Sequence, residues 1–348
     1  EFYLQRSLSG KTKSFSKKNA SVLSETAEQD AKIYDYFGLN ADLNTSFKGL
    51  DFNSQITLNS LDFEKFKKIA TINSELSKVI FSKDDINSKK EVEFSIFGIY
   101  REKVWNGSLG ESDILTAYGV KAKRDHFWAI NNLEQSSQLA LGYGEYQANK
   151  KVNKETIISR KRLNISWERD FKLPIWDPVK IDFINQEFKY TPEAIDRGLD
   201  LFVSAKVDLY TYEDGNSQNL ISFKAGPKII LGNFKKKYFD HTEFSILGRT
   251  TIASGKSPFD FDQSVDNHAI ELDLKQQLIG PLALKYSTEY NLDINSTNFN
   301  QFTKSELELS INRRAYKVGL FYDEERKRGG INFEINSFNF LGYGNKFK

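Results

Sequence analysis

Hydrophobic and polar residues alternate along the C-terminal part of the chain. From Ile270 to Leu278, hydrophobic residues occupy the even positions, apart from Gln276, and charged or amide residues occupy the odd ones. A period of two residues is typical of a β-strand with one apolar face, whereas an α-helix repeats every 3.6 residues. Gly280–Pro281 follows and predicts a turn. A second alternating segment, Leu282–Ile294, comes next, so the pattern predicts two strands joined by a tight turn.

The same alternation extends over most of the chain. Further strands are expected at residues 33–43, 46–58, 92–100, 113–124, 126–131, 137–147, 156–169, 179–189, 199–209, 217–232, 238–254, 307–311, 316–322 and 331–335. Gly329–Gly330 indicates a hairpin turn, and the segment 60–90 fits either a helix or a strand. Together these segments predict about sixteen strands in a large all-β protein.

Two classes of protein produce this pattern. A soluble antiparallel sheet with one wet face alternates in the same way. Three features favour a transmembrane β-barrel: many strands reach ten residues, the polar face is heavily charged, and aromatic residues lie near strand ends. No run of about 18 apolar residues occurs, so a closed barrel is the expected way to cross a membrane.

The composition agrees with a barrel. Hydrophobic residues make up 39% of the chain and the mean hydropathy is −0.53, which is too polar for a helical membrane protein but suits a barrel with a wet lumen. The net charge of +2 suggests no nucleic-acid partner. Residues 1–30 are expected to be a polar lead-in, and residues 31–348 to form the barrel.

Candidate chemistry is sparse. Cysteine is absent, and the three histidines His126, His241 and His268 lie far apart without a metal-ligand spacing. No GxSxG, P-loop or HExxH motif occurs. The cluster Asp240–Glu243 could transfer protons, but His241 also fits an ordinary strand or loop residue. We therefore expect no enzyme activity, no metal and no cofactor.

Glycine and proline predict local geometry. Gly142 and Gly144 lie within a strand pattern and indicate a bend or close packing. Proline lacks the N–H that a strand ladder needs, so all six prolines should lie at strand ends, loops or bulges. They are Pro174, Pro178, Pro192, Pro227, Pro258 and Pro281, and residues 173–178 are expected to form a loop.

Two basic clusters fall at predicted turns. They comprise Lys235, Lys236 and Lys237, and Arg326, Lys327 and Arg328. Such clusters could hold anionic lipid headgroups through charge-assisted hydrogen bonds. Solvated turns would show the same composition, so both interpretations stay open.

Several segments resemble the cyanobacterial branch of the lipopolysaccharide-assembly (LptD-like) outer-membrane proteins. The resemblance covers roughly residues 90–345. It is carried by YREKVWNGSLGESDILTAYG (100–119), FKYTPEAIDRGLDL (188–201), FKAGPKIILGNF (223–234), FDHTEFSILGRTTIASGKSPFDFDQSVD (239–266), QQLIGPLALKYSTEYNLD (276–293) and GGINFEINSFNFLGYG (329–344).

This resemblance implies a barrel in the outer membrane of a Gram-negative-type bacterium. It also implies that residues 1–30 could be the remnant of a periplasmic domain. It implies the insertion of lipopolysaccharide into the outer leaflet through a seam between the first and last strands, with a periplasmic lipopolysaccharide-bridge protein as partner. The chain departs from the better-known branch, because it has no cysteine for linking disulfides and no proline before Pro174. A passive porin-like or structural barrel and an outer-membrane lipid hydrolase remain the alternatives.

The C-terminal segment carries one more expectation. Phe333, Phe338 and Phe340 resemble the aromatic pattern by which the barrel-assembly machinery recognises its substrates. Lipid-facing side chains would also account for them.

Overall fold

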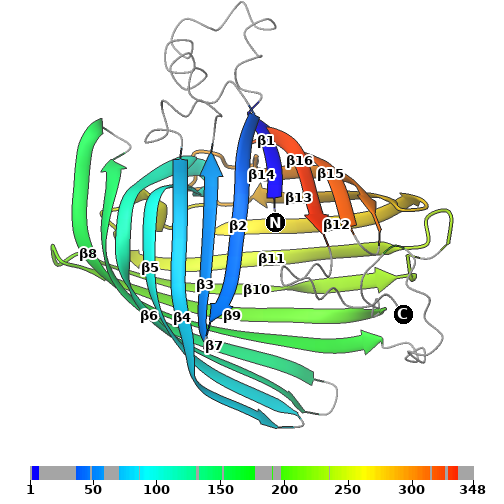
Figure 1. Ribbon diagram of the computed structural model, residues 1–348, viewed down its shortest axis with the longest axis horizontal. Helices are drawn as coiled ribbons and strands as arrows, with labels where there is room; N and C mark the ends of the chain where they lie inside the picture. Colours follow the sequence, from blue (N-terminus) through cyan, green and yellow to red (C-terminus); the bar gives the residue numbers. More distant parts are fainter. Residues whose placement is uncertain are drawn as a thin grey trace, which may run out of the picture.

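The computed structural model is an all-β structure in which sixteen strands follow one another along the described part of the chain, and Figure 1 shows their arrangement. It describes residues 2–7, 37–47, 49–58, 70–85, 87–130, 133–150, 153–176, 190, 197–234, 236–313, 316–325 and 328–335. The strands are β1 (Phe2–Ser7), β2 (Phe37–Phe47), β3 (Leu50–Leu58), β4 (Ala70–Asp85), β5 (Ser88–Trp105), β6 (Glu111–Ile130), β7 (Leu133–Lys150), β8 (Asn153–Trp176), β9 (Gly198–Tyr212), β10 (Ser217–Leu231), β11 (Thr242–Gly255), β12 (His268–Ile279), β13 (Leu282–Asn291), β14 (Phe302–Asn312), β15 (Tyr316–Asp323) and β16 (Arg328–Ile335).

Each strand from β2 to β16 pairs antiparallel with its neighbour in the chain, which forms one continuous sheet. The six residues of β1 pair with β16 on one side and with β2 on the other, and this short strand closes the sheet into a ring. Within the described residues, the helical elements are two single turns, η3 (Gly107–Leu109) and η5 (Asp260–Asp262). No described helix is long and apolar enough to cross a membrane.

The structure confirms strands at most of the predicted segments and corrects several of their boundaries. The ambiguous segment contains β4, and the expected strand at 126–131 is the last part of β6. Gly329–Gly330 lies inside β16 and pairs with Phe321 and Tyr322, so the predicted hairpin turn there is wrong. Residues 2–7 of the expected lead-in form β1 in the sheet. The expected strand at 179–189 lies outside the described residues.

The proline and glycine predictions are confirmed in part: Pro258 and Pro281 lie in connections and Gly144 packs closely against β6, whereas Gly142 has no close neighbour and Pro178 and Pro192 lie outside the described residues. β8 extends to Trp176 rather than ending before the predicted loop, and Pro174 stands at its register shift against β9. Pro227 lies inside β10 without a register shift, so its predicted place at a strand end, loop or bulge is wrong, although the pairs to β11 are missing at Gly226 and Pro227. Gly119 and Gly144 face each other across β6 and β7. A Cβ on Gly119 would lie 2.2 Å from the carbonyl oxygen of Tyr143, so these backbones approach too closely for a side chain.

The two faces of the sheet have opposite polarity, and the exposed face is the apolar one. Among the described residues, 44 large hydrophobic side chains are exposed, whereas 12 hydrophobic residues are buried. On β10, for example, Ile221 and Phe223 are exposed, while between them Ser222 hydrogen-bonds Thr251 across the inner face. The inner, or lumenal, face carries most of the ion pairs, such as Lys224–Glu271 and Arg249–Glu289.

The two ends of the ring differ in their connections. Because consecutive strands are antiparallel, connections after even-numbered strands lie at one end and those after odd-numbered strands at the other. We call the first the short-turn end, since five of its connections span two or three residues: 48–49, 86–87, 131–132, 280–281 and 313–315. We call the other the long-loop end, which includes the connections 256–267 and 292–301.

Candidate functional site

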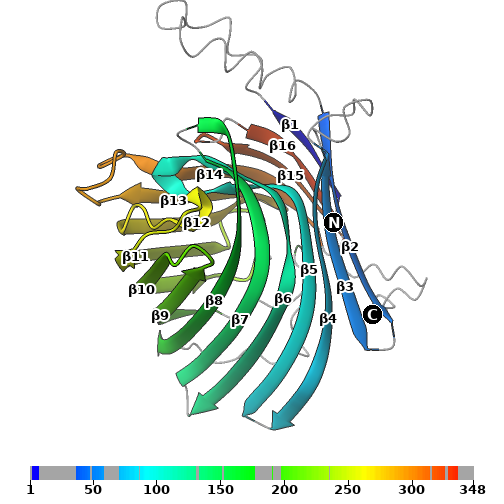
Figure 2. The ribbon, with the colours of Figure 1, turned by 90° about the vertical axis from the view of Figure 1, so that its left-hand side faces the viewer.

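Three connections meet at the long-loop end and form a bridge between distant strands. They are residues 106–110 after β5, 256–267 after β11, and 292–301 after β13. We call these three segments the loop bridge. Figure 2 shows the cyan end of β5 beside the yellow and orange strands. These elements are far apart in the strand order, and the other strands form the rest of the wall.

Asp266 is the centre of the loop bridge. Its carboxylate accepts hydrogen bonds from the backbone N–H of Ser108 (2.7 Å), the side-chain amide of Asn291 (2.7 Å) and the hydroxyl of Ser296 (2.6 Å), and from the hydroxyl of Ser108. Asp266 is fully buried. Since a buried carboxylate is stable only when its oxygens are hydrogen-bonded, this residue ties all three connections together.

Two side chains at the end of β5 extend the bridge. The indole N–H of Trp105 donates to the carbonyl of Thr303 on β14 (3.1 Å). The amide of Asn106 donates to the carbonyls of Asp260 (2.7 Å) and Gln263 (2.8 Å). In the strand order, β5 and β14 are seven positions apart by the shorter way round the ring. The bridge therefore joins opposite parts of the wall and narrows the passage at this end.

Arg162 on β8 anchors the bridge to a third part of the wall. Its guanidinium donates to both carboxylate oxygens of Asp262, at 2.9 and 3.1 Å. The hydroxyl of Tyr212 donates to the same carboxylate (3.1 Å), and the ring of Tyr146 lies 4.6 Å from the guanidinium. Burial raises the pKa of Asp262 to about 6, although Arg162 and Tyr212 favour the ionised form. The hydrogen bonds from Arg162 and Tyr212 therefore help to keep the Asp262 carboxylate ionised despite its burial.

Aromatic packing surrounds this ion pair. Phe259 is fully buried, stacks on Phe261 with ring centroids 4.9 Å apart, and meets Tyr146 and Tyr212. The apolar contacts exclude water from the pair, which strengthens the attraction between the charges and makes the loss of either partner costly. The loop after β11 is therefore held inward by packing and charge together.

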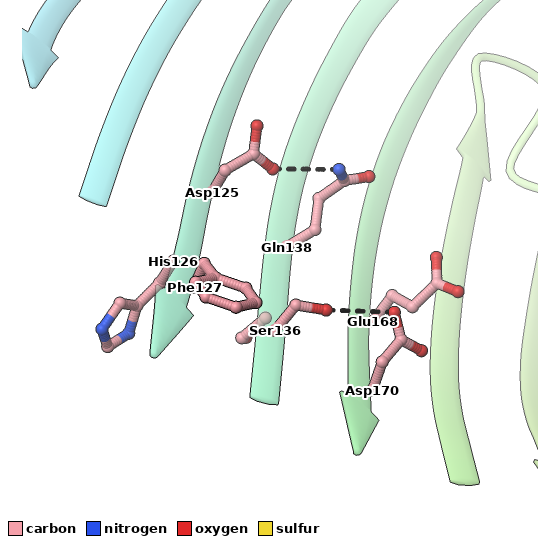
Figure 3. A pocket seen from close by; sticks show the side chains of 8 residues that line it. Asp125, His126, Phe127, Ser136, Gln138, Glu168 and Asp170 are labelled. Carbon is pink, nitrogen blue, oxygen red and sulfur yellow. Dashed lines mark hydrogen bonds between the residues drawn. The ribbon is translucent and has the colours of Figure 1, made fainter. Parts of the chain in front are cut away.

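A pocket on the lumenal wall lies toward the short-turn end (Figure 3). Asp125, Ser136, Gln138, Glu168 and Asp170 line it from β6, β7 and β8. Gln138 donates to Asp125 (2.9 Å) and Ser136 donates to Asp170 (3.1 Å). Its three carboxylates make this wall acidic and wet. Sequence reasoning missed the site because each residue is isolated in the chain, and only the strand register brings them together.

The two predicted basic clusters lie at opposite ends of the ring. Lys236 and Lys237 are exposed in the connection after β10 at the short-turn end, where the ammonium of Lys237 lies 5.2 Å from the ring of Tyr238. Arg328 begins β16 at the long-loop end. Phe333 lies in β16, while Lys235, Arg326, Lys327, Phe338 and Phe340 lie outside the described residues. The structure does not unite the two clusters.

His241 belongs to a buried network next to Lys236. Its Nε2 lies 2.9 Å from Oε1 of Glu243, which also accepts from Lys275 (2.9 Å). Gln277, which is fully buried, donates to the carbonyls of Lys236 (2.8 Å) and Gly280 (2.7 Å). These contacts hold the connection after β10 against the turn after β12. Among the described residues, no group of three His, Cys, Asp or Glu side chains could hold a metal ion.

Comparisons with known proteins give a family and a structural likeness. A family model described as "Protein of unknown function (DUF3769)" matches residues 1–339. No curated protein matches the chain. Among solved structures, the chain is similar to CdiB from Acinetobacter baumannii, with a TM-score of 0.48 and 11% sequence identity. The match covers 86% of this chain and 56% of that one, so this chain spans little more than half of that protein's length.

Proposed function

The chain belongs to this DUF3769 family, and from that premise we propose that it is an outer-membrane β-barrel that inserts lipopolysaccharide into the outer leaflet. The proposed route is a lateral seam where β1 meets β16. No covalent chemistry is required, because the task is to move acyl chains sideways into lipid while the sugar head stays in a polar space.

The observation that carries the membrane placement is the inverted polarity of the sheet. Exposed apolar surface in water favours association or aggregation, whereas the same surface is stable against lipid tails. The described strands place Leu139, Leu141 and Tyr143 outward on β7, each between 43% and 50% exposed. The opposite face carries Gln138 and the carboxylates of Figure 3. This polarity is the one expected for a transmembrane barrel.

The short β1 supports a seam at that position. Hydrogen bonds between strands hold a barrel closed, and β1 offers six residues, whereas β8 has 24. Fewer backbone hydrogen bonds make the junction of β1 with β16 cheaper to open than the pairing among β5 to β8. A lateral exit needs such a place, since a lipid cannot pass through a fully bonded wall.

The loop bridge supports a lateral route over an axial one. It spans the long-loop end and is held by Asp266 and by the Arg162–Asp262 pair. A solute that leaves along the axis would have to pass it, whereas a lipid that leaves sideways would not. We further propose a periplasmic lipopolysaccharide-bridge protein as donor and the barrel-assembly machinery as the route into the membrane.

A passive porin-like barrel is the second candidate. An inward-folded loop that carries acidic residues opposite a basic wall residue narrows a diffusion pore, and residues 256–267 with Arg162 have that form. In this structure, however, the opposed charges pair directly instead of facing open water.

Depletion of the protein in its own cell tests the proposal. We expect less lipopolysaccharide at the cell surface and greater entry of large hydrophobic toxins, both restored by the intact chain. Normal surface lipopolysaccharide after complete depletion would overturn the export function. Loss of small-solute uptake alone would establish the porin-like function instead.

A further inference from the structure

A cationic patch lies on the outward face of β5 to β8. The strand register places Lys90, His126, Ser137 and Arg169 directly opposite one another in one row across the four strands. Arg124 lies in the adjacent row, opposite Val92 and Leu139. In Figure 3 the side chain of His126 points away from those of Asp125 and Gln138. Alternation along each strand therefore places these side chains on the opposite face from Asp125, Gln138 and Glu168, although His126 and Ser137 also border the acidic pocket.

The three permanent cations of this patch have no carboxylate partner among the described residues. Lys90, Arg124 and Arg169 form no ion pair there, and Nε of Arg169 is buried without a hydrogen-bond partner. The inner face of the same strands differs, because Lys123 pairs with Asp125 (2.8 Å) and Lys172 with Glu134 (3.2 Å). The three cations of the patch lack such partners, although Lys83, which lies opposite Lys90 on β4, pairs with Asp85 (2.9 Å) on the same outer face.

Aromatic rings hold the patch in place. The guanidinium of Arg169 lies 5.3 Å from the ring of Trp128 and 4.8 Å from that of Phe171. Its terminal nitrogen donates to Gln135 (3.2 Å), and His126 stacks on Trp128 with centroids 4.2 Å apart. These contacts fix the direction of the guanidinium before any ligand arrives, which lowers the entropic cost of binding.

The surroundings of the patch are apolar. Phe94, Leu141 and Ile165 are exposed two rows away toward the middle of the sheet, and Ile130 and Leu173 are exposed on the turn side. An unpaired cation on a lipid-facing surface is costly unless an anion neutralises it. The ligand must combine a negative group with apolar chains that can cover these side chains.

We propose that this patch binds the phosphate group of an anionic glycerophospholipid, with its acyl chains against the exposed apolar side chains. The inference rests on the membrane placement proposed above but not on lipopolysaccharide export. The patch lies near the turns 86–87 and 131–132. Short turns are typical of the periplasmic side of outer-membrane barrels, so the lipid would belong to the leaflet on that side.

The test uses the full chain reconstituted in nanodiscs of phosphatidylcholine with a minor fraction of phosphatidylglycerol. Native mass spectrometry counts the phosphatidylglycerol molecules retained after gentle release. The double variant Arg124→Gln/Arg169→Gln should lose about tenfold or more in affinity, since charge-assisted hydrogen bonds are roughly twice as strong as neutral ones. Arg124→Lys/Arg169→Lys should keep much of the binding.

Lys228→Gln is the matched control, because it removes one positive charge from the lumenal face of β10, opposite Ser245. It should retain phosphatidylglycerol like the unchanged chain. Heat-modifiable electrophoretic mobility shows whether each variant is folded. Equal retention by the folded Gln double variant would overturn the proposal. Displacement by inorganic phosphate alone, or equal retention of phosphatidylcholine, would overturn a lipid phosphate as the ligand.

The lipid-binding test can be distinguished from tests of the two parts of the proposed function, which are the membrane placement and lipopolysaccharide export. Failure of the chain to enter any bilayer would overturn the membrane placement and this site with it. Normal surface lipopolysaccharide after depletion, combined with selective retention of phosphatidylglycerol, would overturn export and leave the site standing.

Discussion

Arg162 and Asp262 join the wall of the barrel to a loop that starts three strands away. Nη1 of Arg162 on β8 lies 2.9 and 3.1 Å from the two carboxylate oxygens of Asp262 in the connection between β11 and β12. Both side chains are largely buried, at 15% and 6% exposure. Because burial removes the water that would otherwise stabilise each charge, the loss of either partner would weaken the hold on the loop.

Arg162→Gln should release this loop. Breaking a buried ion pair by removing one partner costs about 3–5 kcal/mol, and part of that cost is relieved when the loop moves outward. Lys256 begins the loop, so trypsin should cut the folded variant there about tenfold faster or more. The ion conductance of the reconstituted variant should also rise.

Arg160→Gln provides the control for this experiment. Arg160 lies two residues away on β8, with an exposed side chain 3.4 Å from Asp214. Exposed pairs of this kind contribute about 0–1 kcal/mol, so cleavage and conductance should stay near those of the unchanged chain. If Arg162→Gln and Arg160→Gln behaved alike, the buried pair would not be what holds the loop.

Gly119→Ala should destabilise the barrel. The new Cβ would lie 2.2 Å from the carbonyl oxygen of Tyr143 and 2.9 Å from the ring of Phe97, so β6 and β7 must separate or Phe97 must move. We expect a loss of about 1–3 kcal/mol or more, measured as a lower urea midpoint for the loss of heat-modifiable mobility. Gly142→Ala is the control, since its nearest neighbour is 3.9 Å away. Equal midpoints would show that the close approach is not required.

The strands were predictable because a sheet with one apolar and one polar face produces a two-residue alternation of apolar and polar residues in the sequence. The run from Ile270 to Leu278 became β12, and the Gly280–Pro281 turn stands where it was expected. The prediction failed where local chemistry was ambiguous. Gly329–Gly330 reads as a turn but pairs inside β16, because glycine also fits a strand between closely paired neighbours.

The loop bridge and the cationic patch could not be predicted, for a different reason. Asp266 meets Ser108 and Asn291 only after the strands have brought three distant connections to one end. Lys90 and Arg124 follow other basic residues, Lys89 and Lys123, but alternation places those two on the lumenal face, and Arg169 lies on a third strand. Register across strands creates both sites, and alternation along one strand does not specify which residues will face one another.

Phe340→Ala should lower the amount of assembled barrel in membranes. The expectation comes from the C-terminal aromatic pattern, in which Phe340 would be read by the barrel-assembly machinery. The measurement is the fraction of the chain with heat-modifiable mobility in isolated membranes. Phe239→Ala is the control, because Phe239 is exposed in the connection after β10 and lies far from the C-terminal segment in sequence. Unchanged levels in the Phe340 variant would remove this role.

A cross-link across the proposed seam tests the lateral route directly. The chain contains no cysteine, so the pair Leu4→Cys and Ile331→Cys introduces the only thiols. These residues are opposite each other in the β1–β16 register, and opposite residues in antiparallel strands have Cα atoms within disulfide range. Oxidation should stop new lipopolysaccharide from reaching the cell surface, and a reducing agent should restore it.

The matched control joins the other side of the same strand. Leu320 is opposite Ile331 in the β15–β16 register, so Leu320→Cys with Ile331→Cys adds one disulfide while leaving the β1–β16 junction free. Export should continue in this variant after oxidation. If both cross-links left export intact, lipid would not leave between β1 and β16. If both abolished it, β16 would need to move as a whole rather than separate from β1. Only a block confined to the Leu4–Ile331 pair supports a seam that opens at β1.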